Sequence, residues 1–76
     1  NNKKKYFLEK KFIFKDFINS QKFVNKVGEI SEEENHHPDI SFGWGYALIA
    51  ITTHAIEGLS ENDFILASKI DQIFSA

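Results

Sequence analysis

The chain contains no cysteine, no methionine and no arginine, and only one proline and four glycines. Without cysteine it has no disulfide, no thiol nucleophile and no cysteine-ligated zinc or iron–sulfur site. No apolar run approaches the roughly 20 residues that span a bilayer, and no signal-peptide pattern opens the chain. The formal net charge of −2 argues against a dedicated nucleic-acid binder, which is usually strongly basic. We therefore expect a cytoplasmic protein without nucleic-acid or membrane partners.

What the chain does have is a large share of apolar mass for its 76 residues, with eight phenylalanines, two tyrosines and one tryptophan. A domain of this size buries only about 60% of the surface that its unfolded chain exposes. Apolar surface in excess of what such a core can bury favours association, so we expect one domain over residues 1–76 in a dimer or tetramer. The chain begins with Asn1 rather than Met, and we expect residues upstream of it to be missing.

The first half of the chain predicts a strand followed by a helix. Residues 6–14 show the alternation of apolar and charged side chains that is typical of a strand. Asp16 is placed to cap a helix that continues through the polar run 31–35. Gly28 inside this helix indicates close packing against a neighbouring element. The apolar positions recur at three- and four-residue spacing and predict the buried stripe: Phe17, Ser20, Phe23, Val24, Val27 and Ile30.

The second half predicts a hairpin and a second helix. Extended segments 39–42 and 46–53 flank a turn at residues 43–45, and the second arm is apolar on both faces, as in a central strand. Ser60 opens a capping box for the last helix. The element order predicts an α+β fold, an antiparallel sheet with helices packed on one face in a two-layer sandwich. The predicted buried stripe of the last helix is Phe64, Leu66, Ala67, Ile70, Ile73 and Phe74.

Three histidines are the chemically informative feature of the sequence. If the hairpin folds symmetrically about Gly45, His36 lies across from His54 and His37 lies across from Thr53. Directly opposed side chains of an antiparallel pair lie within about 5.5 Å at Cβ. All three imidazoles are then expected at the open mouth of the hairpin. Their ordinary pKa near 6.5 suits the transfer of protons at neutral pH.

Two carboxylates accompany these imidazoles. Glu32 lies one helical turn before His36 and is expected to face the same cleft, and Asp63 follows early in the last helix. A single histidine at a strand end more often forms a structural hydrogen bond than it takes part in catalysis. The expected convergence of three histidines makes this structural interpretation weaker. Three histidines can also hold catalytic zinc. However, adjacent side chains of an extended segment point to opposite faces, which makes joint ligation by His36 and His37 awkward.

The spacing of these residues resembles the signature of the pterin-4a-carbinolamine dehydratases. The neighbouring segments 14–17 and 58–63 agree with it, and the similarity extends from about Phe7 to Phe74. The histidine–histidine–proline triplet alone is a weak signal, whereas seven residues at fixed spacing are specific. Those seven are Glu32, His36, His37, Pro38, Trp44, His54 and Asp63. Where many relatives carry an aromatic residue two positions after the proline, this chain has Ile40.

The resemblance implies an activity and an assembly. Members of the family dehydrate 4a-hydroxytetrahydropterins, the spent cofactor of aromatic amino acid hydroxylases, to quinonoid dihydropterin and water in tetrahydrobiopterin recycling. They need no metal or organic cofactor, and they form tetramers. Their usual N-terminal helix and first strand are not found in this chain. Two other functions stay open: a non-catalytic binding, assembly or transcription-cofactor module on the same scaffold, and a metallohydrolase.

The resemblance also implies which residues act. His36 and His54 are expected to transfer protons, while His37 binds and orients the pterin. Glu32 and Asp63 are expected to position the imidazoles and the polar edge of the pterin ring. The full set of expected substrate-binding residues is Glu32, Asn35, Pro38, Thr52, Thr53 and Asp63.

Overall fold

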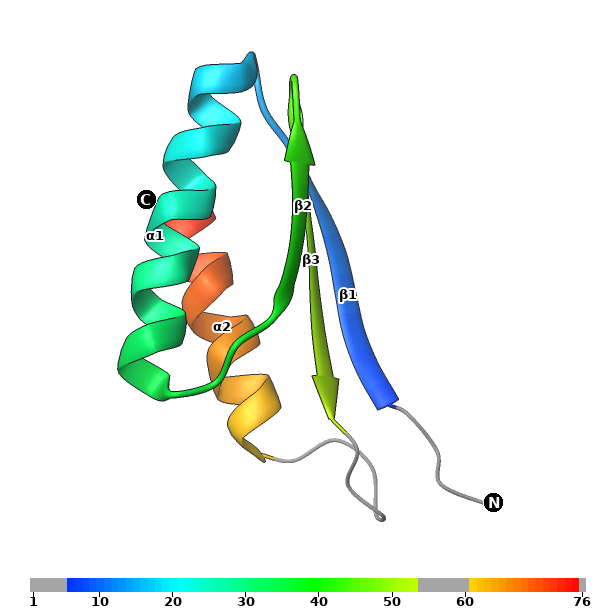
Figure 1. Ribbon diagram of the computed structural model, residues 1–76, viewed down its shortest axis with the longest axis vertical. Coiled ribbons are helices and arrows are strands. Elements are labelled where there is room, and N and C mark those ends of the chain that lie inside the picture. Colours follow the sequence, from blue (N-terminus) through cyan, green and yellow to red (C-terminus); the bar gives the residue numbers. More distant parts are fainter. Residues whose placement is uncertain (1–5, 54–60, 76) are drawn as a thin grey trace.

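The computed structural model describes residues 6–53 and 61–75, with two helices on one face of a three-stranded antiparallel sheet (Figure 1). This confirms the predicted α+β class and two-layer architecture. No helix in the described part of the chain is long and apolar enough to cross a membrane. The elements in chain order are β1 (Tyr6–Ile13), α1 (Phe17–Glu34), β2 (Asp39–Gly43), β3 (Tyr46–Thr53) and α2 (Glu61–Ser75).

The apolar strand β3 lies at the centre of the sheet, as predicted, in the order β1-β3-β2. Its two neighbours differ in length: β1 pairs with all eight residues of β3, whereas β2 pairs with five. The side of β3 that faces the helices is buried, and its other side is only half-buried. The sheet therefore keeps one face uncovered by the described elements.

The predicted hairpin register is wrong by one residue. Gly43 pairs directly with Tyr46, so the turn is the two-residue segment Trp44-Gly45 rather than a turn centred on Gly45. Gly45 takes φ +80, a left-handed conformation that glycine adopts at no steric cost and that permits this tight turn. Its carbonyl oxygen accepts a hydrogen bond from the backbone N–H of Phe14 at 2.8 Å, which joins the turn to the end of β1.

The histidines are consequently not cross-strand partners of β3 residues. Strand β2 begins only at Asp39, so His36 and His37 precede the hairpin ladder, and Thr53 pairs with Tyr6 of β1. The predicted pairing of His37 with Thr53 is wrong for that reason. His54, the predicted partner of His36, lies outside the described residues, as does Ser60, the predicted helix cap.

Helix α1 begins as predicted. Asp16 has an extended backbone, and its carboxylate accepts from the backbone N–H of Asn19 at 3.0 Å, which satisfies one of the free donors of the first turn. The prediction for Gly28 is wrong: a Cβ atom at this position would have no neighbour within 4 Å, so no close approach requires the glycine.

The core lies between the helices and the sheet. At the hairpin-turn end it is aromatic, with Phe23 of α1 packed against Phe12 and Phe14 at ring-centroid distances of 4.8 and 5.1 Å. Toward the other end it is aliphatic, where α2 and α1 pack against each other. The buried hydrophobic residues are Phe12, Phe23, Val27, Ala47, Ile49, Ile51, Leu66 and Ile70.

The predicted stripe of α2 needs two corrections, at Phe64 and Phe74. Phe74 is 44% exposed, although its ring contacts those of Phe12 and Phe14 at centroid distances of 5.0 and 5.4 Å. Phe64 is 54% exposed, while its neighbour Asp63 is fully buried. The inward face of α2 follows Asp63, Leu66 and Ile70, and an adjacent residue lies about 100° away around a helix, so Phe64 faces outward. Phe17 of α1, also expected in the core, is 42% exposed and stacks at 5.5 Å on Phe42.

Candidate active site

The two adjacent histidines follow directly on the end of α1. Asn35 takes the left-handed conformation (φ 52, ψ 43), and its backbone N–H donates to the carbonyl oxygen of Glu32 at 3.1 Å. The N–H of His36 donates to the carbonyl of Ser31 at 3.0 Å. These two bonds form a Schellman motif, in which one left-handed residue ends a helix and turns the chain away. The backbone of His36 is thus fixed by the helix end itself.

His36 is joined to a buried carboxylate on the other helix. Its Nε2 atom lies 2.6 Å from Oδ1 of Asp63, whose side chain is 0% exposed, while the imidazole is 26% exposed. Asp63 lies in the first turn of α2, where the helix dipole favours a negative charge. The contact links residues 27 positions apart, so it exists only because α2 packs beside the end of α1.

His37 is joined to a carboxylate of the preceding helix, α1. Its Nε2 atom lies 3.2 Å from Oε1 of Glu32, five positions earlier, and both side chains are more than half exposed. The sequence pattern placed Glu32 beside His36, and the structure brings it to the next histidine instead. The reason is the left-handed Asn35, which ends the helical progression before either histidine.

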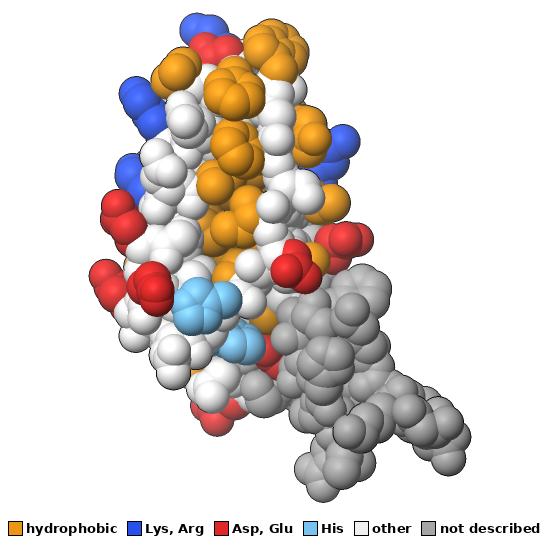
Figure 2. Space-filling view, in the orientation of Figure 1, with side chains coloured by type: hydrophobic (Ala, Val, Ile, Leu, Met, Phe, Trp, Pro, Cys, Tyr) orange, Lys and Arg blue, Asp and Glu red, His pale blue; other side chains and the backbone are white. Residues whose placement is uncertain are grey.

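The structure thus brings four of the predicted site residues into two histidine–carboxylate pairs. On the face shown in Figure 2, the described histidines lie at one end of a strip of hydrophobic side chains. Pro38 is half-buried and leads into β2. His54 lies outside the described residues. Thr52 and Thr53 are described only as the backbone that ends β3.

One contact beside this site was not foreseen. The ammonium of Lys69 on α2 forms an ion pair with the carboxylate of Glu34, the last residue of α1. It ties α2 to the last residue of α1, two positions before His36. The two residues are 35 positions apart, so no local sequence pattern could have indicated the contact.

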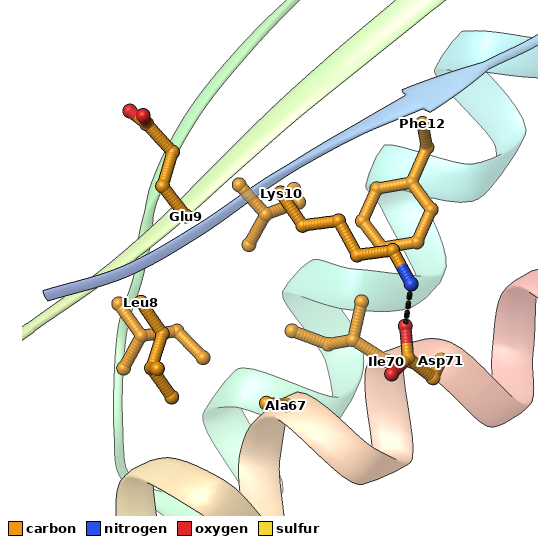
Figure 3. A pocket seen from close by; sticks show the side chains of 9 residues that line it. Leu8, Glu9, Lys10, Phe12, Ala67, Ile70 and Asp71 are labelled. Atoms are coloured by element: carbon orange, nitrogen blue, oxygen red, sulfur yellow. Dashed lines mark hydrogen bonds and ion pairs between the residues drawn. The ribbon is translucent and has the colours of Figure 1, made fainter.

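An apolar pocket between β1, β3 and α2 is separate from the histidines (Figure 3). Leu8, Phe12 and Ile70 are among its lining residues, and no histidine is. At its rim the ammonium of Lys10 donates to Asp71 across 3.0 Å, which ties β1 to α2. Among residues 6–53 and 61–75, no group of three or more histidine, aspartate or glutamate side chains is arranged to hold a metal ion.

The chemistry of the His36–Asp63 pair follows from hydrogen-bond roles. With Asp63 ionised, its carboxylate only accepts, and the contact then requires a proton on Nε2 of His36. The other ring nitrogen, Nδ1, is then the atom that can take a proton from a bound molecule. The carboxylate holds the ring in this tautomer and stabilises the imidazolium that forms, as in other carboxylate–histidine pairs. The arrangement is therefore suited to general acid–base chemistry.

Comparison with known proteins identifies the family of the chain. The family described as pterin 4 alpha carbinolamine dehydratase matches residues 2–73 of the chain. The chain belongs to this family. A pterin-4-alpha-carbinolamine dehydratase named as putative in Rubrobacter xylanophilus is 53% identical over 66 residues, which cover 87% of this chain and 62% of that protein. One from Halorhodospira halophila is 56% identical over 64 residues, covering 84% and 59%. The chain thus spans about three fifths of the length of these dehydratases.

Solved structures of dehydratase-like proteins share the fold. A transcriptional coactivator/pterin dehydratase from Brucella melitensis superposes with a TM-score of 0.80 at 26% identity, over 91% of this chain and 73% of that one. A pterin dehydratase-like protein identified as a RuBisCO assembly factor in the alpha-carboxysome gives 0.79 at 25% identity, over 100% and 93%. The resemblance to the pterin carbinolamine dehydratases, a family named for a hydro-lyase, is confirmed.

Proposed function

We propose that the protein is a hydro-lyase that dehydrates 4a-hydroxytetrahydropterins to quinonoid dihydropterin and water. The observation that carries this proposal is the 2.6 Å contact between His36 and the fully buried Asp63, in a chain of the pterin carbinolamine dehydratase family. A buried carboxylate on one imidazole nitrogen prepares the other nitrogen for proton transfer. Such a transfer is typically worth roughly 10²–10⁴-fold in rate.

The reaction needs one proton removed and one proton supplied. A base takes the proton from N5 of the pterin, and the N5 electron pair forms a double bond to C4a. The C4a–O bond breaks as an acid protonates the departing hydroxyl, which leaves as water. We assign one of these transfers to Nδ1 of His36 and the other to His54, with His37 orienting the pterin. No metal or organic cofactor takes part in the proposal.

The carboxylates have different tasks in this proposal. Asp63 is 0% exposed, which supports a role in positioning His36 rather than contact with the pterin. Glu32 is 73% exposed beside His37, so its carboxylate is accessible to the N–H groups of a pterin ring edge. Pro38, Thr52 and Thr53 remain further proposed substrate contacts.

We further propose that the protein acts as a homo-oligomer, a dimer or tetramer, in tetrahydrobiopterin recycling in the cytoplasm. The half-buried sheet face and several exposed large side chains, among them Ile13, Ile18 and Trp44, support association. The oligomeric state in solution, measured by light scattering, tests this part.

The test of the activity is direct. We expect the chain to accelerate the dehydration of freshly prepared 4a-hydroxytetrahydropterin, and we expect His36→Ala and His54→Ala each to lose most of this rate. Gln21→Ala is the matched control, because this exposed side chain lies near the start of α1, whereas the histidines follow the end of that helix. A wild-type rate no faster than buffer, or equal rates for wild type and both histidine variants, contradicts the proposal. A rate that chelator abolishes favours the metallohydrolase instead.

A non-catalytic assembly module is the second candidate. It is favoured by the solved RuBisCO assembly factor, which matches this chain over the full length of the chain. Retention of His36, His37, His54 and Asp63 favours the enzyme. Tight capture of a partner protein by a chain without dehydratase activity reverses this ranking.

A further inference from the structure

We propose that Asn35 is a positioning residue of the site, and that it acts through its backbone rather than through its amide. Its left-handed conformation directs His36 toward Asp63 on α2 and lets His37 return to Glu32 on α1. The consequence for catalysis rests on the proposed dehydratase function. The consequence for the geometry of His36 does not.

The backbone of Asn35 is unusual within the structure. In the described ranges 6–53 and 61–75 it is the only residue other than glycine with a positive φ. This conformation costs most L-residues free energy, because Cβ approaches the carbonyl oxygen, whereas asparagine and aspartate tolerate it better. The sequence thus carries at position 35 a residue type that suits this conformation.

The hydrogen bonds show what this conformation achieves. With Asn35 left-handed, its own N–H bonds back to Glu32 and the next N–H, that of His36, bonds back to Ser31. Both bonds depend on the reversal of the chain at one residue. Ser31 is itself 2% exposed and anchored, since its hydroxyl donates to the carbonyl of Val27 at 2.7 Å. The position of His36 is therefore fixed from the buried side of α1.

The side chain of Asn35 has no comparable attachment. It is exposed, and within the part of the chain that the structure describes it makes no hydrogen bond. Two roles can account for an asparagine here: an amide that binds the pterin, or a backbone that accepts φ +52. Glycine separates them, because it adopts positive φ freely and has no amide.

The experiment compares Asn35→Gly and Asn35→Ala with wild type. Ring-nitrogen NMR signals of ¹⁵N-labelled histidine report the tautomer and environment of His36, and steady-state kinetics report kcat and KM. We expect Asn35→Gly to keep the His36 signals and to keep kcat within about twofold. We expect Asn35→Ala to shift those signals and to lower kcat about tenfold or more with KM little changed, because small misplacements of catalytic groups are costly.

Gly45→Ala is the matched control for backbone strain. It places a Cβ at φ +80 in the hairpin turn, 3.3 Å from the carbonyl oxygen of Phe14. We expect it to lower the melting temperature while the His36 signals keep their wild-type positions. A matching shift of the His36 signals in this variant would show that general destabilisation, and not the end of α1, moves the imidazole.

Two results overturn the proposal. If Asn35→Gly raises KM as strongly as Asn35→Ala does, the amide binds the substrate. If Asn35→Ala leaves the His36 signals and kcat unchanged, the left-handed residue is not needed. If the wild-type chain has no dehydratase activity, the proposed function fails, and the NMR comparison of the two variants still decides the positioning role.

Discussion

The two histidine–carboxylate pairs differ in contact distance, in burial and in the separation of their residues along the chain, although their histidines are neighbours. The His36–Asp63 contact is 2.6 Å long, joins two helices and ends on a carboxylate with no exposed surface. The His37–Glu32 contact is 3.2 Å long, joins residues five positions apart and is open to solvent. One pair depends on tertiary packing, and the other depends only on the end of α1.

The difference bears on how strongly each carboxylate can act. A contact in a low-dielectric interior is electrostatically stronger than one in water, and leaving its polar groups unpaired is costly. An exposed pair between flexible side chains contributes little, typically about 0–1 kcal/mol. We therefore expect the buried pair to fix the reactive imidazole and the exposed pair to adjust binding. The following changes test that division, from the largest expected effect to the smallest.

Leu66→Ala loosens the helix that carries Asp63. Leu66 is 0% exposed and lies three residues after Asp63 on the same face of α2. Truncating a buried leucine typically costs about 2–5 kcal/mol, so we expect a loss of this size in the free energy of unfolding, which urea titration measures. We expect the His36 ring signals to change in the folded fraction while those of His37 stay. If both histidines respond equally, the two pairs are not independent.

Asp63→Asn removes the charge of the buried carboxylate and keeps its shape. The amide can donate as well as accept, so the Nε2–H tautomer of His36 is no longer enforced. We expect kcat to fall about 100-fold, within the usual contribution of a general acid–base group, with a smaller change in KM. A loss of less than about threefold would show that Asp63 does not prepare His36.

Lys69→Ala breaks the ion pair with Glu34 that holds α2 beside the end of α1. Both side chains are partly exposed, so we expect the free energy of unfolding to fall by about 1 kcal/mol or less, together with a small shift of the His36 signals. Lys10→Ala is the matched control, because its pair with Asp71 ties α2 to β1 instead. Equal shifts from the two variants would show that the Lys69–Glu34 contact has no special connection to the site.

Glu32→Gln tests the exposed pair. We expect a change below about 0.5 kcal/mol in the free energy of unfolding, since both partners are solvated. We also expect unchanged His36 signals and a rise in KM without a matching loss of kcat, because Glu32 is proposed to contact the pterin. A loss of kcat comparable to that of Asp63→Asn would erase the distinction between the pairs.

Local patterns in the sequence predicted much of the fold. Asp16 as a helix cap, the position of α1 and the central place of β3 follow from side-chain chemistry and periodicity acting within a few residues. The wrong predictions concerned the hairpin register, the packing at Gly28 and the outward-facing aromatic residues. The observed turn Trp44-Gly45 shifts the hairpin register by one residue from the predicted one, and such a shift changes every opposed pair.

The four residues of the two histidine–carboxylate pairs belong to the predicted set, but their pairing was not predicted. The spacing of the motif indicated both histidines and both carboxylates, because these four residues belong to the family signature. It did not indicate that Glu32 contacts His37, or that Asp63 is fully buried. Phe64 was expected in the core for a similar reason: hydrophobicity alone does not show which face of α2 turns inward.

The sequence by itself determined the family, the order of the elements and the residue types available for proton transfer, because these follow from local chemistry and from spacing along the chain. Only the tertiary structure decided which carboxylate serves which histidine. That choice depends on the turn at Asn35 and on the docking of α2 against α1, which bring together groups 27 positions apart. Burial then makes the two pairs unequal, since charges interact more strongly around the buried carboxylate of Asp63 than around the solvated carboxylate of Glu32.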